Sequence, residues 1–159
     1  MASISDAVIG YCNYMFAPRA YLRRFFNEPS PHIALIDEAH NLYDRACDMY
    51  SASLTKAPIQ ELKRLFKDRH KPLAKVLGAL NLKFIECRHE LEEKKVYDLF
   101  KDDVDKTFLT KIQSLLEVLE KYLYQYPETE YKPQLMNLYF DCHQFLRISD
   151  FYNESFRVR

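Results

Sequence analysis

The chain has 159 residues, of which 48 % are hydrophobic, and its formal net charge is zero at pH 7. This composition is sufficient for a packed core and excludes a disordered chain, and the length suits one domain or parts of two. Because the net charge is zero, only local basic patches are candidates for nucleic-acid binding. The two glycines, Gly10 and Gly78, cannot form a Gly-x-x-x-x-Gly-Lys-Ser/Thr loop, which excludes a complete nucleotide-phosphate site within this chain.

The N-terminal part of the chain predicts a small βαβ unit. Strands are expected at 6–10 and 32–37, and a helix at about 18–27 is expected to begin at Pro18. Strands joined in this way are parallel and right-handed, and two of them cannot bury both faces alone, so we expect a slice of a larger sheet. Its exposed sheet edge predicts a possible homodimer through four apolar residues: Val8, Ile9, Ile33 and Leu35.

The second expected strand runs directly into Asp37-Glu38-Ala39-His40. A carboxylate at the tip of a buried parallel strand can hold Mg²⁺ beside nucleotide phosphates, and the next carboxylate can orient and polarise an attacking water. These roles would fall to Asp37 and Glu38, respectively. The other interpretation is an ordinary helix start, with Asp37 as the N-cap and Glu38 in the first turn.

The chain after His40 predicts helices joined by short loops, which together form a helical bundle. Apolar residues recur at helical spacing, and prolines mark several helix starts and stops. The expected helices span residues 41–50, 58–69, 71–95, 96–126 and 133–154, and a break of the fourth near Asp102-Asp103 is left open.

A basic cluster surrounds the junction near residue 70: Lys63, Arg64, Lys67, Arg69, Lys71 and Lys75. One interpretation is contact with DNA phosphates. The other is a solvated helix face balanced by acids elsewhere in the chain, such as Asp98, Asp102, Asp103 and Asp105. Tyrosines later in the sequence could stack on bases, although packing is the commoner role: Tyr122, Tyr124, Tyr126, Tyr131 and Tyr139.

The four cysteines are dozens of residues apart, so none has the close partner that zinc ligands usually have. Scattered single cysteines are typical of a reducing compartment. No signal peptide opens the chain, and no apolar run approaches the length of a membrane span. We therefore expect a cytoplasmic protein without a membrane partner.

Two segments around the DEAH sequence, 6–19 and 37–54, resemble a known family. They are similar to the XPD/DinG-like iron–sulfur DNA helicases of superfamily 2, in which an apolar strand, an Asn-Tyr-x-Phe-Asp-Pro-like segment and a helix precede DEAH-Asn-Leu. The resemblance implies that Asp37-Glu38-Ala39-His40 is the Walker B element (motif II). It implies that Asp37 serves ATP and Mg²⁺ binding and that Glu38 and His40 belong to the catalytic motif.

The order of elements is also similar to that family, in which a mostly helical arch domain follows the DEAH motif. The resemblance implies that residues 1–50 are part of motor domain 1, residues 51–150 are the arch, and residues 151–159 return toward the motor. The chain would then be a fragment of an ATP-dependent DNA helicase, inactive alone, whose arch helps frame an opening for single-stranded DNA. The iron–sulfur ligands of the parent protein would lie upstream of this chain.

The alternative interpretation is a stand-alone helical module without catalysis that binds a protein partner or single-stranded DNA. The two interpretations differ in whether the reading frame extends on both sides of this chain.

Overall fold

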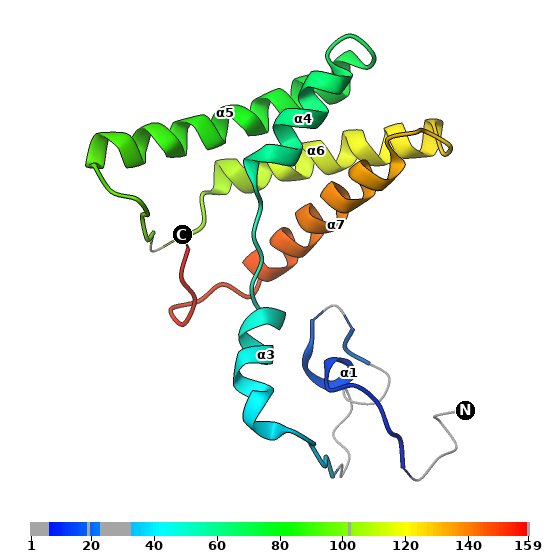
Figure 1. Ribbon diagram of the computed structural model, residues 1–159, viewed down its shortest axis with the longest axis vertical. Coiled ribbons are helices and arrows are strands. Elements are labelled where there is room, and N and C mark those ends of the chain that lie inside the picture. Colours follow the sequence, from blue (N-terminus) through cyan, green and yellow to red (C-terminus); the bar gives the residue numbers. More distant parts are fainter. Residues whose placement is uncertain (1–6, 19, 23–32, 102, 159) are drawn as a thin grey trace. The chain divides into compact units, whose positions relative to one another are not determined.

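The computed structural model describes residues 7–18, 20–22, 33–101 and 103–158. It is mostly helical and divides into two compact units, Met1–Ser51 and Ala52–Arg159. The helices in chain order, shown in Figure 1, are α1 (Asn13–Phe16), the 3-10 helix η2 (Ala39–Asn41), α3 (Leu42–Met49), α4 (Lys56–Phe66), α5 (Lys71–Lys94), α6 (Lys106–Gln125) and α7 (Lys132–Ser149).

The predicted βαβ slice is wrong for the part of the N-terminal unit that the structure describes. Residues 7–10 and 33–36 form no strand, and residues 20–22 are not helical; residues 23–27 of the expected helix lie outside the described ranges. Ile33 and Leu35 are 94 % and 95 % exposed instead of buried. A strand needs hydrogen-bonded neighbours, and the apolar run has none among the described residues. The sheet edge proposed for a homodimer is therefore also missing there, and the homodimer itself stays a prediction.

The described part of the N-terminal unit is held together by contacts between α1 and α3. The Tyr50 hydroxyl, just after α3, donates a hydrogen bond to the Phe16 carbonyl at 3.1 Å. The Arg45 guanidinium lies 3.8 Å from the Cys12 sulfur. These contacts join the Asn-Tyr-x-Phe segment to the helix that follows the DEAH sequence.

The Ala52–Arg159 unit confirms the predicted helical bundle. Helix α5 packs against α4 and α6, and α7 packs against α6 and α4. Each helix contributes an apolar stripe at the spacing expected for a buried face. The fully or almost fully buried residues are Ile59, Leu62 and Phe66 of α4, Leu73, Leu77 and Leu80 of α5, Ile112, Leu115 and Leu119 of α6, and Leu135, Leu138 and Cys142 of α7.

The described residues between α5 and α6 are not helical, so the helix expected from residue 96 begins only at Lys106, a few residues after the break left open near Asp102-Asp103. Lys95 ends α5 with a φ of 52°, in the left-handed region. Asp105 then caps α6, because its carboxylate accepts hydrogen bonds from the backbone N–H groups of Thr107 and Phe108 at 2.8 and 3.3 Å. Acidic side chains that bond nearby backbone groups favour a helix start here over a continuous helix.

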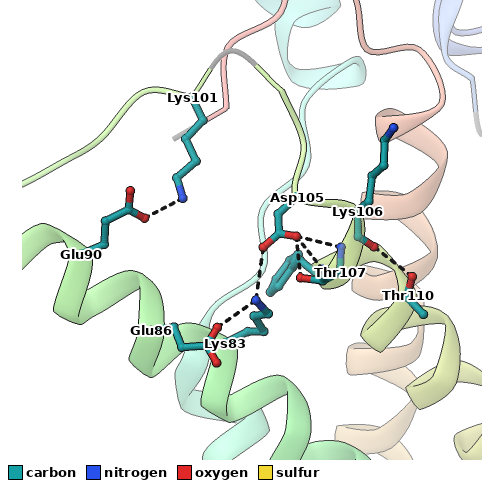
Figure 2. A network of polar contacts seen from close by, with 9 residues as sticks. Lys83, Glu86, Glu90, Lys101, Asp105, Lys106, Thr107 and Thr110 are labelled. Atoms are coloured by element: carbon teal, nitrogen blue, oxygen red, sulfur yellow. Dashed lines mark hydrogen bonds and ion pairs between the residues drawn. The ribbon is translucent and has the colours of Figure 1, made fainter.

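Ion pairs attach this segment to α5, as Figure 2 shows. The Lys83 ammonium lies 2.8 Å from Glu86 and 3.5 Å from Asp105, and the Lys101 ammonium lies 2.7 Å from Glu90. The backbone N–H of Lys101 also donates to the Val158 carbonyl at 3.0 Å in an isolated antiparallel bridge. Residues near the C-terminus therefore contact the α5–α6 connection.

Replacing the α6 cap should weaken the unit in a pH-dependent way. Hydrogen bonds from Thr107 and Phe108, together with the charge of Lys83, lower the pKa of Asp105 from 3.8 to about 2. Because the folded-state pKa is lowered, this stabilisation is present above pH 4 and is lost as the pH falls toward 2. We expect Asp105→Ala to reduce the free energy of unfolding at pH 7 by about 1 kcal/mol.

Urea unfolding followed by circular dichroism at pH 7, 4 and 2.5 measures this effect. Asp103→Ala is the matched control, because it removes the same charge from the same connection without removing the α6 cap. The gap between Asp105→Ala and the wild type should narrow toward pH 2.5. A gap that is the same for both variants, or that does not change with pH, would contradict the assignment.

Candidate functional site

Asp37 and Glu38 form a turn that leads directly into the 3-10 helix η2, which contains Ala39 and His40 and is followed by α3. The Asp37 carboxylate accepts a hydrogen bond from the Glu38 N–H at 2.9 Å. Glu38 has a φ of 51° and a ψ of 41°, in the left-handed region that few residues other than glycine adopt. The Asn41 N–H donates to the Glu38 carbonyl at 3.0 Å, which closes the first turn.

The alternative interpretation of this segment as a helix start agrees with the structure in part, because η2 begins at Ala39 and continues directly into α3, but the N-cap position falls to Glu38 instead of Asp37. Helix α3 begins at Leu42, and the flanking residue Asn41 makes no side-chain cap hydrogen bond. Glu38 precedes η2 and also does not cap it with its side chain. Asp37 and Glu38 thus lie outside the helix.

The carboxylate of Glu38 and the imidazole of His40 lie together at the surface. The Glu38 Oε2 atom is 3.3 Å from His40 Nε2, and the two side chains are 58 % and 72 % exposed. Asp37 is exposed beside them. The turn therefore brings together the three predicted residues of the DEAH sequence, without burying any of them.

Asp37 and Glu38 carry carboxylate oxygens, the type of ligand that Mg²⁺ prefers. Mg²⁺ keeps several waters, and it is usually bound by one or two carboxylates together with substrate phosphates. Glu38 N–H bonds to Asp37 Oδ1, which leaves Oδ2 for a cation. Within the described ranges, no group of three or more His, Cys, Asp or Glu residues is placed to hold a metal ion. The remaining ligands would have to come from phosphates and water.

The structure separates the six residues of the basic cluster into two kinds. Four are exposed and form no ion pair with any residue of the described ranges, and these are named the open cations: Arg64, Lys67, Lys71 and Lys75. Lys63 is half-buried, and its Cε atom lies 3.6 Å from the position that a Cβ at Gly78 would take. Arg69 is paired with Glu130 at 3.1 Å, and its guanidinium lies 5.2 Å from the centre of the Tyr131 ring.

Two of the four acids that were named as balancing charges, Asp103 and Asp105, have contacts within the α5–α6 connection, with α5 or with α6. Asp105 contacts Lys83 and caps α6, and Asp103 accepts a hydrogen bond from the Val104 N–H at 2.7 Å. Asp102 lies outside the described residues. The open cations lie near the end of α4 and the start of α5, and the exposed Asp68 lies among them in the sequence.

A cleft of about 650 Å³ lies between the α4–α5 and α6–α7 loops. Three of the tyrosines considered from the sequence line it, whereas Tyr124 is 91 % exposed and Tyr139 instead bonds to Glu120. Arg69 belongs to the basic cluster selected from the sequence, whereas Thr129 and Glu130 were not selected, and these residues come together only when the two loops meet. The lining residues are Arg69, His70, Tyr122, Tyr126, Thr129, Glu130 and Tyr131.

The four cysteines differ in exposure: Cys47 and Cys87 are exposed, and Cys12 is half-buried. Cys142 is fully buried, and burial raises its pKa to about 12. All four cysteines are free thiols. No helix in the described ranges is long and apolar enough to cross a membrane.

Comparisons of this chain with protein-family models, with curated proteins and with solved structures find no match. The resemblance to the XPD/DinG-like helicases therefore depends on the residues quoted for it, in segments 6–19 and 37–54.

Proposed function

We propose that this chain is a segment of an ATP-dependent DNA helicase of XPD/DinG type. The observation that carries the proposal is the Asp37-Glu38-Ala39-His40-Asn41-Leu42 sequence, preceded by Asn13-Tyr14-Met15-Phe16-Ala17-Pro18. In the proposal, the DEAH sequence is the Walker B element and the α4–α7 bundle is the arch that contacts single-stranded DNA. The Arg45–Cys12 and Tyr50–Phe16 contacts bring the Asn-Tyr segment and α3 together in one local structure, and this supports the proposal.

The chemistry assigned to the turn follows from its donor atoms. Bound Mg²⁺ would neutralise charge on the transferred phosphoryl group. Asp37 would hold this ion through its free carboxylate oxygen, and Glu38 would orient and polarise the attacking water. His40 contacts Glu38 at 3.3 Å, so it can position that carboxylate. The phosphate loop, the second motor domain and the iron–sulfur cluster would be supplied by other parts of the parent protein.

The chain by itself should not hydrolyse ATP. It contains no glycine-rich phosphate loop, and a second motor domain would be needed to bring an arginine to the γ-phosphate. The measurement is release of phosphate from ATP, with and without single-stranded DNA. Turnover that disappears in Glu38→Gln would contradict this expectation.

A polypeptide extended upstream to include the phosphate loop, and downstream to include the second motor domain, tests the proposal itself. Glu38→Gln in that polypeptide should lower DNA-stimulated ATP hydrolysis by about 10²- to 10⁴-fold, because water activation is lost. Single-stranded DNA binding should be unchanged, because the substitution is not in the bundle. Glu61→Gln on the exposed face of α4 is the matched control and should keep full turnover. Equal turnover in the wild type and Glu38→Gln would overturn the role of the DEAH sequence.

The second candidate function is a helical module that binds single-stranded DNA without catalysis. The observation that favours it is the Ala52–Arg159 unit, which has its own buried core and carries the open cations. Both candidates predict DNA binding by the bundle, and only the first predicts a nucleotide site in the parent protein.

A further inference from the structure

We propose that the cleft between the α4–α5 and α6–α7 loops binds one unstacked base of a single-stranded nucleic acid. Tyr126 would provide the stacking face, and the flanking phosphates would contact Lys67 and Lys71. This inference rests on the proposed function, in which the bundle contacts single-stranded DNA, and it names the site of that contact.

The aromatic wall of the cleft is fixed by packing. The Tyr122 ring is 9 % exposed and contacts Phe66 edge-on, with ring centres 5.2 Å apart. The His70 ring is edge-on to Tyr122 at 4.9 Å, and its Nδ1 atom is fixed because it caps α5 through the Leu73 N–H at 3.2 Å. A wall held in this way can receive a flat ring without reorganisation, which lowers the cost of binding.

Tyr126 differs from the wall because its ring is partly open to solvent. The residue is 44 % exposed, and its ring centre lies 4.8 Å from that of Tyr122, at an interplanar angle of 39°. One side of the ring is thus supported by the core while part of its surface remains accessible. Partly exposed aromatic rings of this kind are the usual stacking platforms for bases of single-stranded nucleic acids.

The polar groups of the cleft can bond the edge of a base. Glu130 accepts a hydrogen bond from Tyr131 and pairs with Arg69 at 3.1 Å, and these contacts keep its pKa below its usual range. The carboxylate can therefore accept from the amino group of a base at neutral pH, while Arg69 can donate to a base carbonyl. The Thr129 hydroxyl, 3.4 Å from the Tyr122 hydroxyl, adds a group that can donate or accept. Base edges present both donors and acceptors, so this mixture suits them.

The charge around the cleft suits the phosphates on either side of the bound base. Arg69 is neutralised by Glu130, so it adds little net attraction for an anion. Lys67 and Lys71, two residues before and after Arg69, are exposed open cations and are available for phosphate contacts.

The test compares two labelled strands of the same length by fluorescence anisotropy at low salt. One strand is oligo(dT), and the other has abasic sugars throughout, so that it keeps the phosphates but lacks the bases. Wild-type protein should bind oligo(dT) about 5- to 150-fold more tightly than the abasic strand, which is the range for stacking of one base. This comparison needs no variant, so it does not depend on whether a substituted protein folds.

Variants then locate the stacking face. Tyr126→Ala should lose most of the preference for oligo(dT) and keep its affinity for the abasic strand, whereas Tyr126→Phe should keep the preference. Tyr124→Ala is the matched control, because Tyr124 lies two residues earlier in the last turn of α6, is 91 % exposed and does not line the cleft. It should behave as the wild type.

Each outcome decides a separate claim. Equal wild-type affinity for the two strands, or an equal effect of Tyr126→Ala and Tyr124→Ala, would overturn the cleft as a base site and leave phosphate binding by the bundle intact. Absence of binding to both strands at low salt would overturn the DNA-contacting role of the bundle as well.

Discussion

Phe66→Ala is expected to lower the free energy of unfolding of the Ala52–Arg159 unit by about 3–5 kcal/mol. Phe66 is fully buried, and its ring packs edge-on against Tyr122 and Tyr131 at 5.2 and 5.4 Å. Removing the ring loses the free energy gained by its burial and leaves a cavity beneath the loops at one end of the bundle. Total stabilities of domains are about 5–15 kcal/mol, so this single change removes a large fraction.

The loss is measured by urea unfolding, followed by far-ultraviolet circular dichroism. Tyr124→Ala removes an aromatic ring of similar size from a position that is 91 % exposed, and it should change stability by no more than about 0.5 kcal/mol. If Phe66→Ala and Tyr124→Ala were equally stable, the packing described for this end of the bundle would be incorrect.

Charge reversal of two open cations should have the largest effect on DNA binding. The four open cations predict non-specific dissociation constants of about 10⁻⁴ to 10⁻⁶ M at physiological salt. The logarithm of affinity should fall with the logarithm of salt concentration with a slope of about −0.7 for each phosphate contact, so about −2.8 for four contacts. Arg64→Glu with Lys67→Glu should weaken binding roughly tenfold or more and bring the slope to about −1.4.

Fluorescence anisotropy with a labelled single strand over a salt series gives both quantities. The control is Lys95→Glu with Lys106→Glu, which changes the net charge equally at two exposed lysines beside the α5–α6 connection. That variant should retain nearly the wild-type affinity and slope. Equal weakening by both double variants would mean that only net charge matters and that the open cations are not the site of contact.

The bundle could be predicted from the sequence because its signals are local. Apolar spacing marked the buried faces, and Pro133 marked the start of α7 to within one residue. The start of α6 was misplaced by ten residues, because the left-handed Lys95 and the cap at Asp105 depend on backbone geometry that apolar spacing does not encode. Helix existence was thus easier to predict than the helix boundary.

The structure of the N-terminal unit, unlike the bundle, could not be predicted from local signals. The apolar run before Asp37 has the composition of a buried parallel strand, but a strand also requires neighbouring strands, which lie far away in sequence or in other segments. The position of the DEAH turn could be read directly from its residues. The left-handed backbone of Glu38 and its contact with His40 could not, because they depend on how the turn enters η2.

The cleft was only partly predictable. The sequence selected its tyrosines as possible stacking residues but did not distinguish Tyr126 from Tyr124, which lies two residues away on the same helix. It also did not join Arg69 to Glu130, since that pair forms only when the two loops meet at one end of the bundle. Pairing the expected helices as antiparallel neighbours would have placed these loops together.

The most direct test of the helicase proposal is determination of the coding sequence around this chain, together with the mass of the native polypeptide. The proposal predicts a polypeptide much larger than 19.0 kDa, with a Gly-x-x-x-x-Gly-Lys-Ser/Thr loop encoded upstream of Asp6 and a second motor domain encoded after Arg159. In-frame stop codons immediately on both sides, with a native mass of 19.0 kDa, would contradict it.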